Sequence, residues 1–213
     1  ILLAIPIMLQ QLSGNILNIC DTIMVGKISD KAISAVTVAN KTYLIYTLFI
    51  FGISSGISMF MSQYYGAKQY GLAKKAYKFG VEVCLVIATV FVVALIIAPE
   101  VFIRLFVNSQ EIVDNGIKYI SIVRWSYIPI ALSQITAVYY RVFKKQNIPM
   151  ILSMVSVALN VLFNYAFIYG NFGMPRLGIE GAAIATTLSR YIEFAVSFTI
   201  LIVFNNGKEI FLD

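Results

Sequence analysis

Long apolar stretches separated by short polar connections run through the whole chain of 213 residues. A helix needs about 20 apolar residues to cross the hydrocarbon core of a bilayer. Such stretches cover residues 2–25, 35–61, 79–98, 117–143, 150–169 and 178–204. They are too long for the strands of about 10 residues in outer-membrane barrels. The pattern therefore predicts an all-α integral membrane protein with six transmembrane helices.

Composition agrees with a membrane setting, because 12% of the residues are charged whereas soluble domains carry about 25%. The six stretches leave almost no room for a soluble domain. The chain starts with Ile1 inside an apolar run and stops at Asp213 just after the last stretch. No basic leader with a cleavage site precedes the first stretch. We therefore expect residues 1–213 to be a fragment of a longer protein.

Basic side chains gather in two connections that contain no acidic residue, after the second and the fourth stretch. Cytoplasmic loops carry an excess of Lys and Arg, so these connections and both chain ends are predicted to be cytoplasmic. The net charge of +6 is explained by this topology rather than by a nucleic-acid partner. The basic residues are Lys68, Lys74, Lys75 and Lys78, and then Arg141, Lys144 and Lys145.

The first stretch contains one charged residue, Asp21, within a polar arc. A carboxylate at the bilayer centre costs roughly 2.5 to 3.5 kcal/mol, so such residues usually face a bundle interior or a water-filled cavity. At about 100° per residue the polar positions share one side of a helix. The arc predicts a cation site at Asp21, and the alternative is a hydrated residue near a helix end. Its other members are Gln10, Gln11, Gly14, Asn15, Asn18 and Thr22, of which Gln11, Asn18 and Thr22 are expected to support the site.

Two later stretches carry polar faces of their own. Residues Ser153, Ser156, Asn160 and Asn164 follow one another at helical spacing. Such a face either holds helices together through hydrogen bonds or supplies ligands if it meets Asp21.

The last stretch places Thr186, Arg190, Glu193 and Ser197 on one side. Arg190 and Glu193 are three residues apart, which brings their side chains together on a helix. Pairing is the usual way in which a membrane span tolerates charge. We expect a structural ion pair, with a direct role in transport as the alternative.

Enzymatic chemistry is not expected, because the chain has no histidine and no metalloprotease, serine-elbow or P-loop motif. Cys20 and Cys84 both fall in predicted spans without CxxC spacing, so they are predicted to be small packing residues. No organic cofactor is expected.

Several segments together resemble the multidrug and toxic compound extrusion (MATE) family. They are Pro6, Asp21-Thr22-Ile23-Met24-Val25-Gly26, Gln63-Tyr64-Tyr65-Gly66-Ala67-Lys68 and Gly178-Ile179-Glu180-Gly181-Ala182-Ala183-Ile184-Ala185-Thr186. Members have twelve transmembrane helices in two lobes and exchange organic cations or other amphipathic compounds for H⁺ or Na⁺. The chain is similar to the N-terminal lobe, so the resemblance implies a C-terminal lobe outside it.

The resemblance also implies that Asp21 is the cation-coupling aspartate, with Asn160 and Thr186 at the same site. Some members carry a second aspartate where this chain has Asn164, so a two-carboxylate proton site is not implied here. We expect H⁺ or Na⁺ to be coupled at Asp21, Asn160, Asn164 and Thr186, with Asp21 and Asn160 as the Na⁺ ligands if the ion is Na⁺.

The expected function is multidrug efflux by antiport in the plasma (inner) membrane, in a bacterium. A flippase of lipid-linked sugars or an oligosaccharide exporter is the nearest alternative. A membrane-embedded enzyme and a purely structural membrane subunit are the more distant ones.

Overall fold

A computed structural model describes residues 4–206. Every regular element in that range is a helix, which confirms the all-α prediction. The elements are α1 (Ala4–Gly26), α2 (Asp30–Gly66), α3 (Tyr70–Ile97), α4 (Pro99–Arg104), α5 (Gln110–Val123), the 3₁₀ helix η1 (Arg124–Ser126), α6 (Tyr127–Val142), α7 (Asn147–Tyr169) and α8 (Ile179–Asn206).

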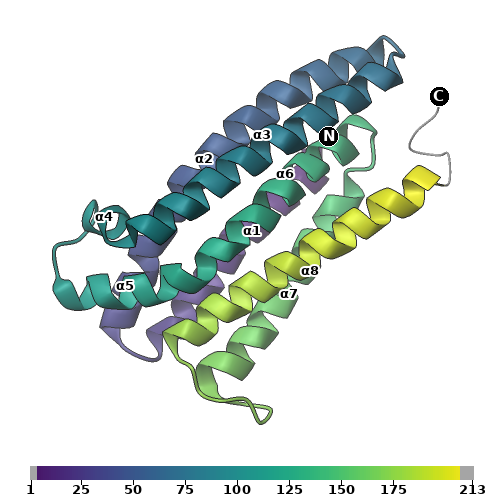
Figure 1. Ribbon diagram of the computed structural model, residues 1–213. Coiled ribbons are helices and arrows are strands. Elements are labelled where there is room, and N and C mark those ends of the chain that lie inside the picture. The colour runs from purple at the N-terminus through teal and green to yellow at the C-terminus, as the bar shows by residue number, and fades with distance from the viewer. Residues whose placement is uncertain (1–3, 207–213) are drawn as a thin grey trace.

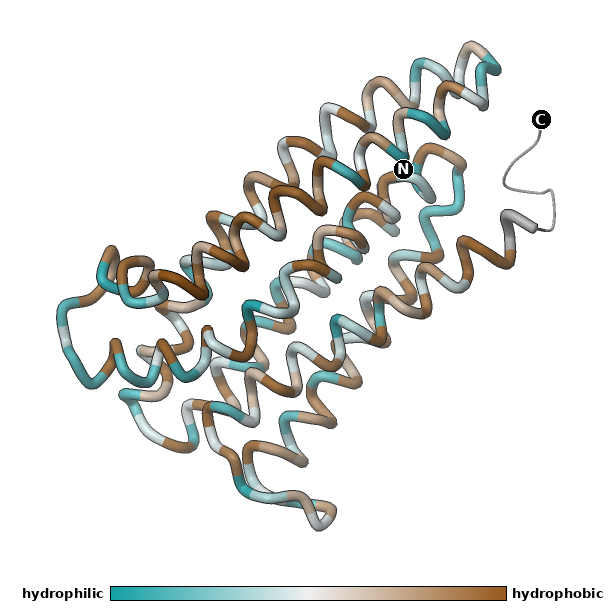
Figure 2. The backbone as a smooth tube through the Cα atoms, viewed as in Figure 1, coloured by the Kyte–Doolittle hydropathy of each residue, from teal (hydrophilic) through white to brown (hydrophobic). Residues whose placement is uncertain are grey.

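The helices form one elongated bundle (Figure 1), with α2 and α3 along one side and α7 and α8 along the other. The first turn of α1, the α2–α3 turn and the α6–α7 turn lie at the same end. Apolar residues dominate the middle of the bundle, and polar residues are frequent near its ends (Figure 2). Ile5, Leu12 and Ile23 of α1 are exposed, as expected for a side that faces lipid.

Four helices, α2, α3, α7 and α8, are long and apolar enough to cross a membrane. The other two predicted spans, at 2–25 and 117–143, correspond to α1 and to the segment from α5 to α6. The span at 2–25 is α1, whose apolar character is lowered by its polar arc, and residues 2 and 3 lie outside the described range. The span at 117–143 is not one continuous α-helix, because it consists of α5, η1 and α6. Both chain ends predicted to be cytoplasmic lie outside the described residues.

Proline explains the break between α5 and α6. Pro129 has no N–H to donate to the carbonyl of Trp125, four residues earlier, and its ring crowds that carbonyl. The backbone tightens into η1 just before it. The hydroxyl of Tyr191 on α8 donates to the carbonyl oxygen of Trp125 at 3.2 Å. A side chain of another helix thus satisfies the acceptor that the proline leaves open.

Local signals set other helix ends. The Ser29 hydroxyl accepts a hydrogen bond from the Ala32 N–H at 3.1 Å and caps the start of α2. Pro99 opens α4, where its missing N–H costs nothing. Gly170 ends α7 with φ of 76°, a left-handed conformation that glycine adopts without strain.

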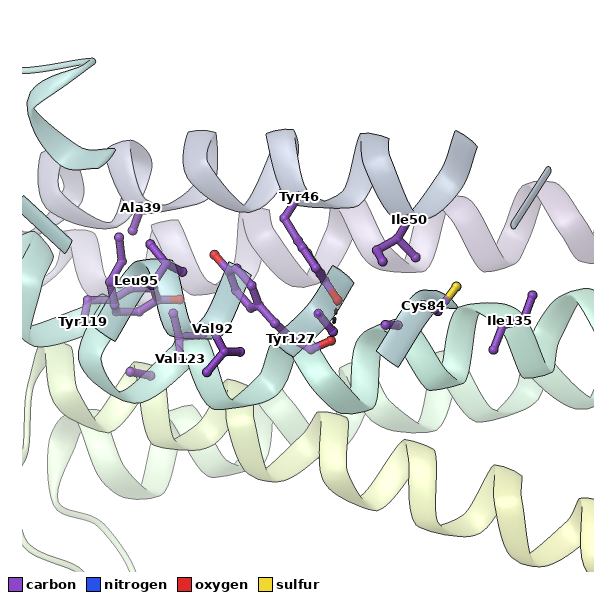
Figure 3. Close-up of a cluster of buried hydrophobic side chains, with 14 of the residues drawn as sticks. Ala39, Tyr46, Ile50, Cys84, Val92, Leu95, Tyr119, Val123, Tyr127 and Ile135 are labelled. Atoms are coloured by element: carbon purple, nitrogen blue, oxygen red, sulfur yellow. Dashed lines mark hydrogen bonds between the residues drawn. The ribbon is translucent and has the colours of Figure 1, made fainter. Parts of the chain in front are cut away.

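The hydrophobic core lies mainly between α2, α3, α5 and α6 (Figure 3). The rings of Tyr46 and Tyr127 stack with their centroids 4.4 Å apart, and the Tyr46 hydroxyl donates to the Tyr127 carbonyl at 2.5 Å. Cys84 is fully buried there, as its predicted packing role requires, whereas Cys20 is partly exposed. This core fixes one side of the bundle and leaves α1, α7 and α8 to form the other.

Helices α7 and α8 approach each other closely at Gly181. A β-carbon at this position would lie 2.6 Å from the carbonyl oxygen of Phe167, closer than atoms tolerate. The glycine therefore lets the start of α8 touch the end of α7. Thr186 follows just over one turn later, so this contact brings it toward the polar face of α7.

Candidate cation-coupling site

A closed ring of hydrogen bonds joins Asp21 of α1 to three residues of α7 and α8. Asn164 Nδ2 donates to Asp21 Oδ1 at 2.5 Å and to Asn160 Oδ1 at 3.1 Å. Asn160 Nδ2 donates to Thr186 Oγ1 at 3.2 Å, and Thr186 Oγ1 donates to Asp21 Oδ2 at 2.8 Å. The structure thus brings together the four residues that the sequence assigns to coupling.

The ring is removed from solvent. Asp21 is 1% exposed, and Asn160 and Asn164 are fully buried. A carboxylate has about four acceptor positions on its two oxygens, and the ring uses two of them. The side-chain oxygen Asn164 Oδ1 is buried and accepts no hydrogen bond. Buried acceptors are normally satisfied, so this atom retains the capacity to accept a hydrogen bond or to contact a cation.

Contacts between α1, α7 and α8 outside the ring hold these three helices together around it. The hydroxyl of Tyr169 at the end of α7 donates to the Met24 carbonyl of α1 at 2.9 Å. Asn160 and Asn164 lie four residues apart on α7 and therefore share one face. The close contact at Gly181 completes the arrangement from the side of α8.

The residues predicted to support the site lie in different places. Asn18 lines a small cavity beside Thr186, and Gln11 is exposed and lines a larger cavity nearer the start of α1. The Thr22 hydroxyl donates to the Asn18 carbonyl of its own helix at 2.8 Å. The direct hydrogen bonds to Asp21 come from α7 and α8 rather than from these neighbours.

Arg190 and Glu193 form the expected ion pair, with 2.9 Å between Arg190 Nη1 and Glu193 Oε2. Both side chains line the larger cavity, which has a volume of about 280 Å³. Amides and hydroxyls supply much of the remaining lining, together with Tyr43 and Phe51. The cavity is therefore lined by both polar and apolar side chains, and this ion pair adds no net charge to it.

Sequence reasoning does not find Tyr119 of α5. This side chain is 2% exposed and lines the small cavity together with Thr186 and Arg190. Tyr119 lies near the start of the fourth stretch, in a segment with charges of both signs. Its sequence neighbours do not distinguish it from a tyrosine that only packs in the core. No signal in the sequence singles it out.

Ligand types in the ring suit a hard monovalent cation. Carboxylate, amide and hydroxyl oxygens are hard ligands, and they suit hard cations better than soft transition metals. Among residues 4–206, no group of three or more His, Cys, Asp and Glu side chains is placed to hold a metal ion. The ring presents one carboxylate within a neutral polar frame.

The fold is an all-α bundle, and four of its helices within residues 4–206 are long and apolar enough to cross a membrane. The MatE family model matches residues 6–166, and the chain belongs to this family, which is the MATE family that the sequence resembles. A similar curated protein is the probable multidrug resistance protein NorM of Haemophilus ducreyi, which is 27% identical over 206 residues. Another is the multidrug resistance protein MdtK of Yersinia enterocolitica, at 24% over 192 residues.

The chain spans less than half of the length of these relatives. The match to NorM covers 92% of this chain and 42% of the relative, and the match to MdtK covers 90% and 42%. These shares agree with a single lobe of a two-lobe protein.

Solved structures share the fold. One is an outward-facing multidrug resistance MATE family transporter, with a TM-score of 0.85, 21% identity, and coverage of 95% of this chain and 44% of that one. The Vibrio cholerae MATE transporter VcmN in its bent form gives a TM-score of 0.85 at 18% identity, with coverage of 94% and 45%. These likenesses confirm the arrangement of the helices.

Proposed function

We propose that this chain is the ion-coupling lobe of a multidrug efflux antiporter that exports organic cations and other amphipathic compounds in exchange for H⁺ or Na⁺. One observation carries the proposal. Asp21 is a buried carboxylate in α1, the helix at the predicted span 2–25, and its ring partners leave acceptor positions unfilled. Ionisable residues in such positions usually belong to ion or substrate pathways.

The ring offers a place for either coupling ion. Na⁺ would be bound by oxygens of Asp21, Asn160, Asn164 and Thr186, including the unpartnered Asn164 Oδ1. A proton on Asp21 would neutralise the carboxylate and give it a hydrogen to donate to such an acceptor. Either ion removes the cost of an uncompensated buried charge.

Exchange follows from competition between the ion and the substrate. When the lobe faces outward, Asp21 takes up the ion, α1 shifts or bends, and substrate leaves to the outside. The two lobes then rock to the inward-facing state, where substrate binding releases the ion. By linkage, each ligand lowers the affinity for the other by the same factor.

The relatives and the charge of the cavity support efflux of cations over the alternatives. NorM and MdtK are named as multidrug resistance proteins. A flippase for pyrophosphate-linked sugars would favour a cavity with excess positive charge, whereas Arg190 is offset by Glu193 here. The topology of six spans with cytoplasmic ends, in the inner membrane of a bacterium, belongs to this proposal.

Ethidium efflux from cells that express the full-length protein tests the proposal. We expect extrusion that stops when one gradient, of protons or of sodium ions, is collapsed and continues when the other is. That gradient identifies the coupling ion. Extrusion that survives the collapse of both gradients, or no extrusion of any organic cation, contradicts antiport.

A further inference from the structure

One arginine lines both of the cavities described above. Arg190 lines the larger cavity of about 280 Å³ and also the small one of about 20 Å³, which has room for roughly one water molecule. The larger cavity also holds Glu193, and the small one also holds Thr186, a member of the Asp21 ring. Arg190 therefore lies between the larger cavity and the coupling site.

The guanidinium is only partly satisfied by Glu193. The side chains of Arg190 and Glu193 are 13% and 11% exposed, so both charges are largely removed from solvent. A guanidinium has five N–H donors, and Arg190 Nη1 donates to Glu193. The Nε atom of Arg190 is buried and has no partner. Arg190 thus retains the capacity to bind a second acceptor.

A second carboxylate lies within reach. Thr186 precedes Arg190 by one helical turn, and residues four apart on a helix are neighbours. Thr186 donates directly to Asp21, so the Asp21 carboxylate lies close to the turn of α8 that carries Arg190. A guanidinium that leaves Glu193 therefore has a second carboxylate, that of Asp21, in its neighbourhood.

Charge counting then limits what this group of residues can bind. Asp21 and Glu193 contribute two negative charges and Arg190 one positive charge, which leaves one negative charge in a poorly solvated site. An uncompensated buried charge is strongly unfavourable, so the group accepts one monovalent cation. In the structure Arg190 is paired with Glu193, which leaves Asp21 for the coupling ion.

We propose that Arg190 is shared between Glu193 and Asp21, so that an organic cation bound to Glu193 in the larger cavity and a coupling ion bound to Asp21 exclude each other. A cation on Glu193 releases Arg190, which moves to Asp21 and displaces the ion. An ion on Asp21 returns Arg190 to Glu193 and expels the organic cation. The inference rests on the proposed antiport and adds a substrate carboxylate and a residue that enforces exchange.

Binding of tetraphenylphosphonium to the purified full-length protein tests the inference. In the wild type, each tenfold rise of the competing ion, Na⁺ or H⁺, should raise the apparent Kd of tetraphenylphosphonium about tenfold at high ion concentration. In Arg190→Gln neither Asp21 nor Glu193 can pair with an arginine, so each carboxylate binds one cation. A tenfold rise of the ion concentration should then change the apparent Kd of tetraphenylphosphonium by less than about twofold. Glu193→Gln should weaken tetraphenylphosphonium binding about tenfold or more.

Two further variants separate this role from a merely structural one. Arg190→Lys retains the positive charge and should restore competition. Arg141→Gln is the matched control, because Arg141 of α6 donates to the Ala137 carbonyl of its own helix and lines neither of the two cavities. It should compete as the wild type does. Thermal unfolding confirms that each variant is folded.

The outcomes are distinct. Competition in folded Arg190→Gln that equals the wild type would overturn the shared arginine and leave antiport intact. Absence of competition in the wild type would contradict the proposed antiport itself.

Discussion

Asp21 is stabilised by a polar frame that is built from uncharged side chains. Thr186 and Asn164 donate to its two carboxyl oxygens, and Asn160 links these two donors to each other. Neutral donors stabilise the carboxylate without cancelling its charge. The site therefore retains an attraction for cations that a buried arginine or lysine partner would remove.

Replacing the hydroxyl donor should weaken the ion site. Thr186→Val keeps the shape of the side chain and removes a hydrogen bond to a charged group, worth about 1.5 to 3 kcal/mol. If Na⁺ is the coupling ion, we expect its affinity to fall about tenfold or more, because the threonine oxygen is also one of its proposed ligands. Ion titration of substrate binding in the purified protein measures the change.

The adjacent residue supplies the control for this substitution. The Thr187 hydroxyl donates to the Ala183 carbonyl in its own helix at 2.7 Å. Thr187→Val should leave ion affinity within about twofold of the wild type. Equal losses in both variants would show that the hydroxyl of Thr186 has no special role.

At the residue scale the sequence predicts which side chains form polar faces. Asn160 and Asn164 follow from helical spacing, and the carboxyl of Asp21 is conspicuous in an apolar helix. The sequence does not show that these faces meet, because periodicity describes each helix separately. Their meeting depends on packing between helices, and this also explains why Tyr119 is missed.

At the element scale, the contact between α7 and α8 depends on Gly181. The β-carbon of Gly181→Ala would clash with the backbone of Phe167, and such overpacking typically costs about 1 to 3 kcal/mol. We expect a lower unfolding temperature and, if Na⁺ is the coupling ion, weaker Na⁺ binding, because Thr186 would be displaced. Thermal unfolding and ion titration measure both effects.

Gly56 of α2 offers a matched control, since no atom lies within 4 Å of a β-carbon built there. Gly56→Ala should leave stability unchanged or raise it by up to about 1 kcal/mol through better helix propensity. If Gly181→Ala behaves in the same way, the close contact does not limit the packing of α8.

The break between α5 and α6 gives a second prediction at this scale. Tyr191→Phe should cost about 0.5 to 1.5 kcal/mol of stability, because the Trp125 carbonyl loses its donor. In a Pro129→Ala background the N–H of residue 129 can donate to the Trp125 carbonyl. Tyr191→Phe should therefore reduce the stability by less in that background. A double-mutant cycle of unfolding free energies measures the difference, and strictly additive effects would refute this link.

The sequence predicts the elements better than their interruptions. Lengths and positions of the long helices follow from apolar stretches, because the bilayer requires about 20 residues. Pro129 lies in the fourth stretch, where a proline can bend a helix. Whether a proline bends a helix or breaks it depends on partners such as Tyr191, which lie far away in sequence.

At the scale of the whole molecule, the basic connections predict how the lobe is oriented. Lys144 lies just before α7 and Phe172 just after it, and both side chains are exposed. The two residues therefore lie at opposite ends of α7. In a background without Cys20 and Cys84, Phe172→Cys should react with a membrane-impermeant maleimide in intact cells. Lys144→Cys should react only after the membrane is opened.

Reversed labelling of these two positions would show that the lobe has the opposite orientation in the membrane. It would also place the start of α1 and the larger cavity on the outer side. The order of ion and substrate binding in the proposed cycle would then have to be reversed.

The most direct test of the account is ion-driven ethidium efflux by Asp21→Asn in the full-length protein. Asp30→Asn is the matched control, because Asp30 is exposed at the first turn of α2. We predict that normally inserted Asp21→Asn extrudes no more ethidium than cells without the transporter, whereas Asp30→Asn stays within about twofold of the wild type. Wild-type efflux by Asp21→Asn would contradict a coupling site at the buried carboxylate.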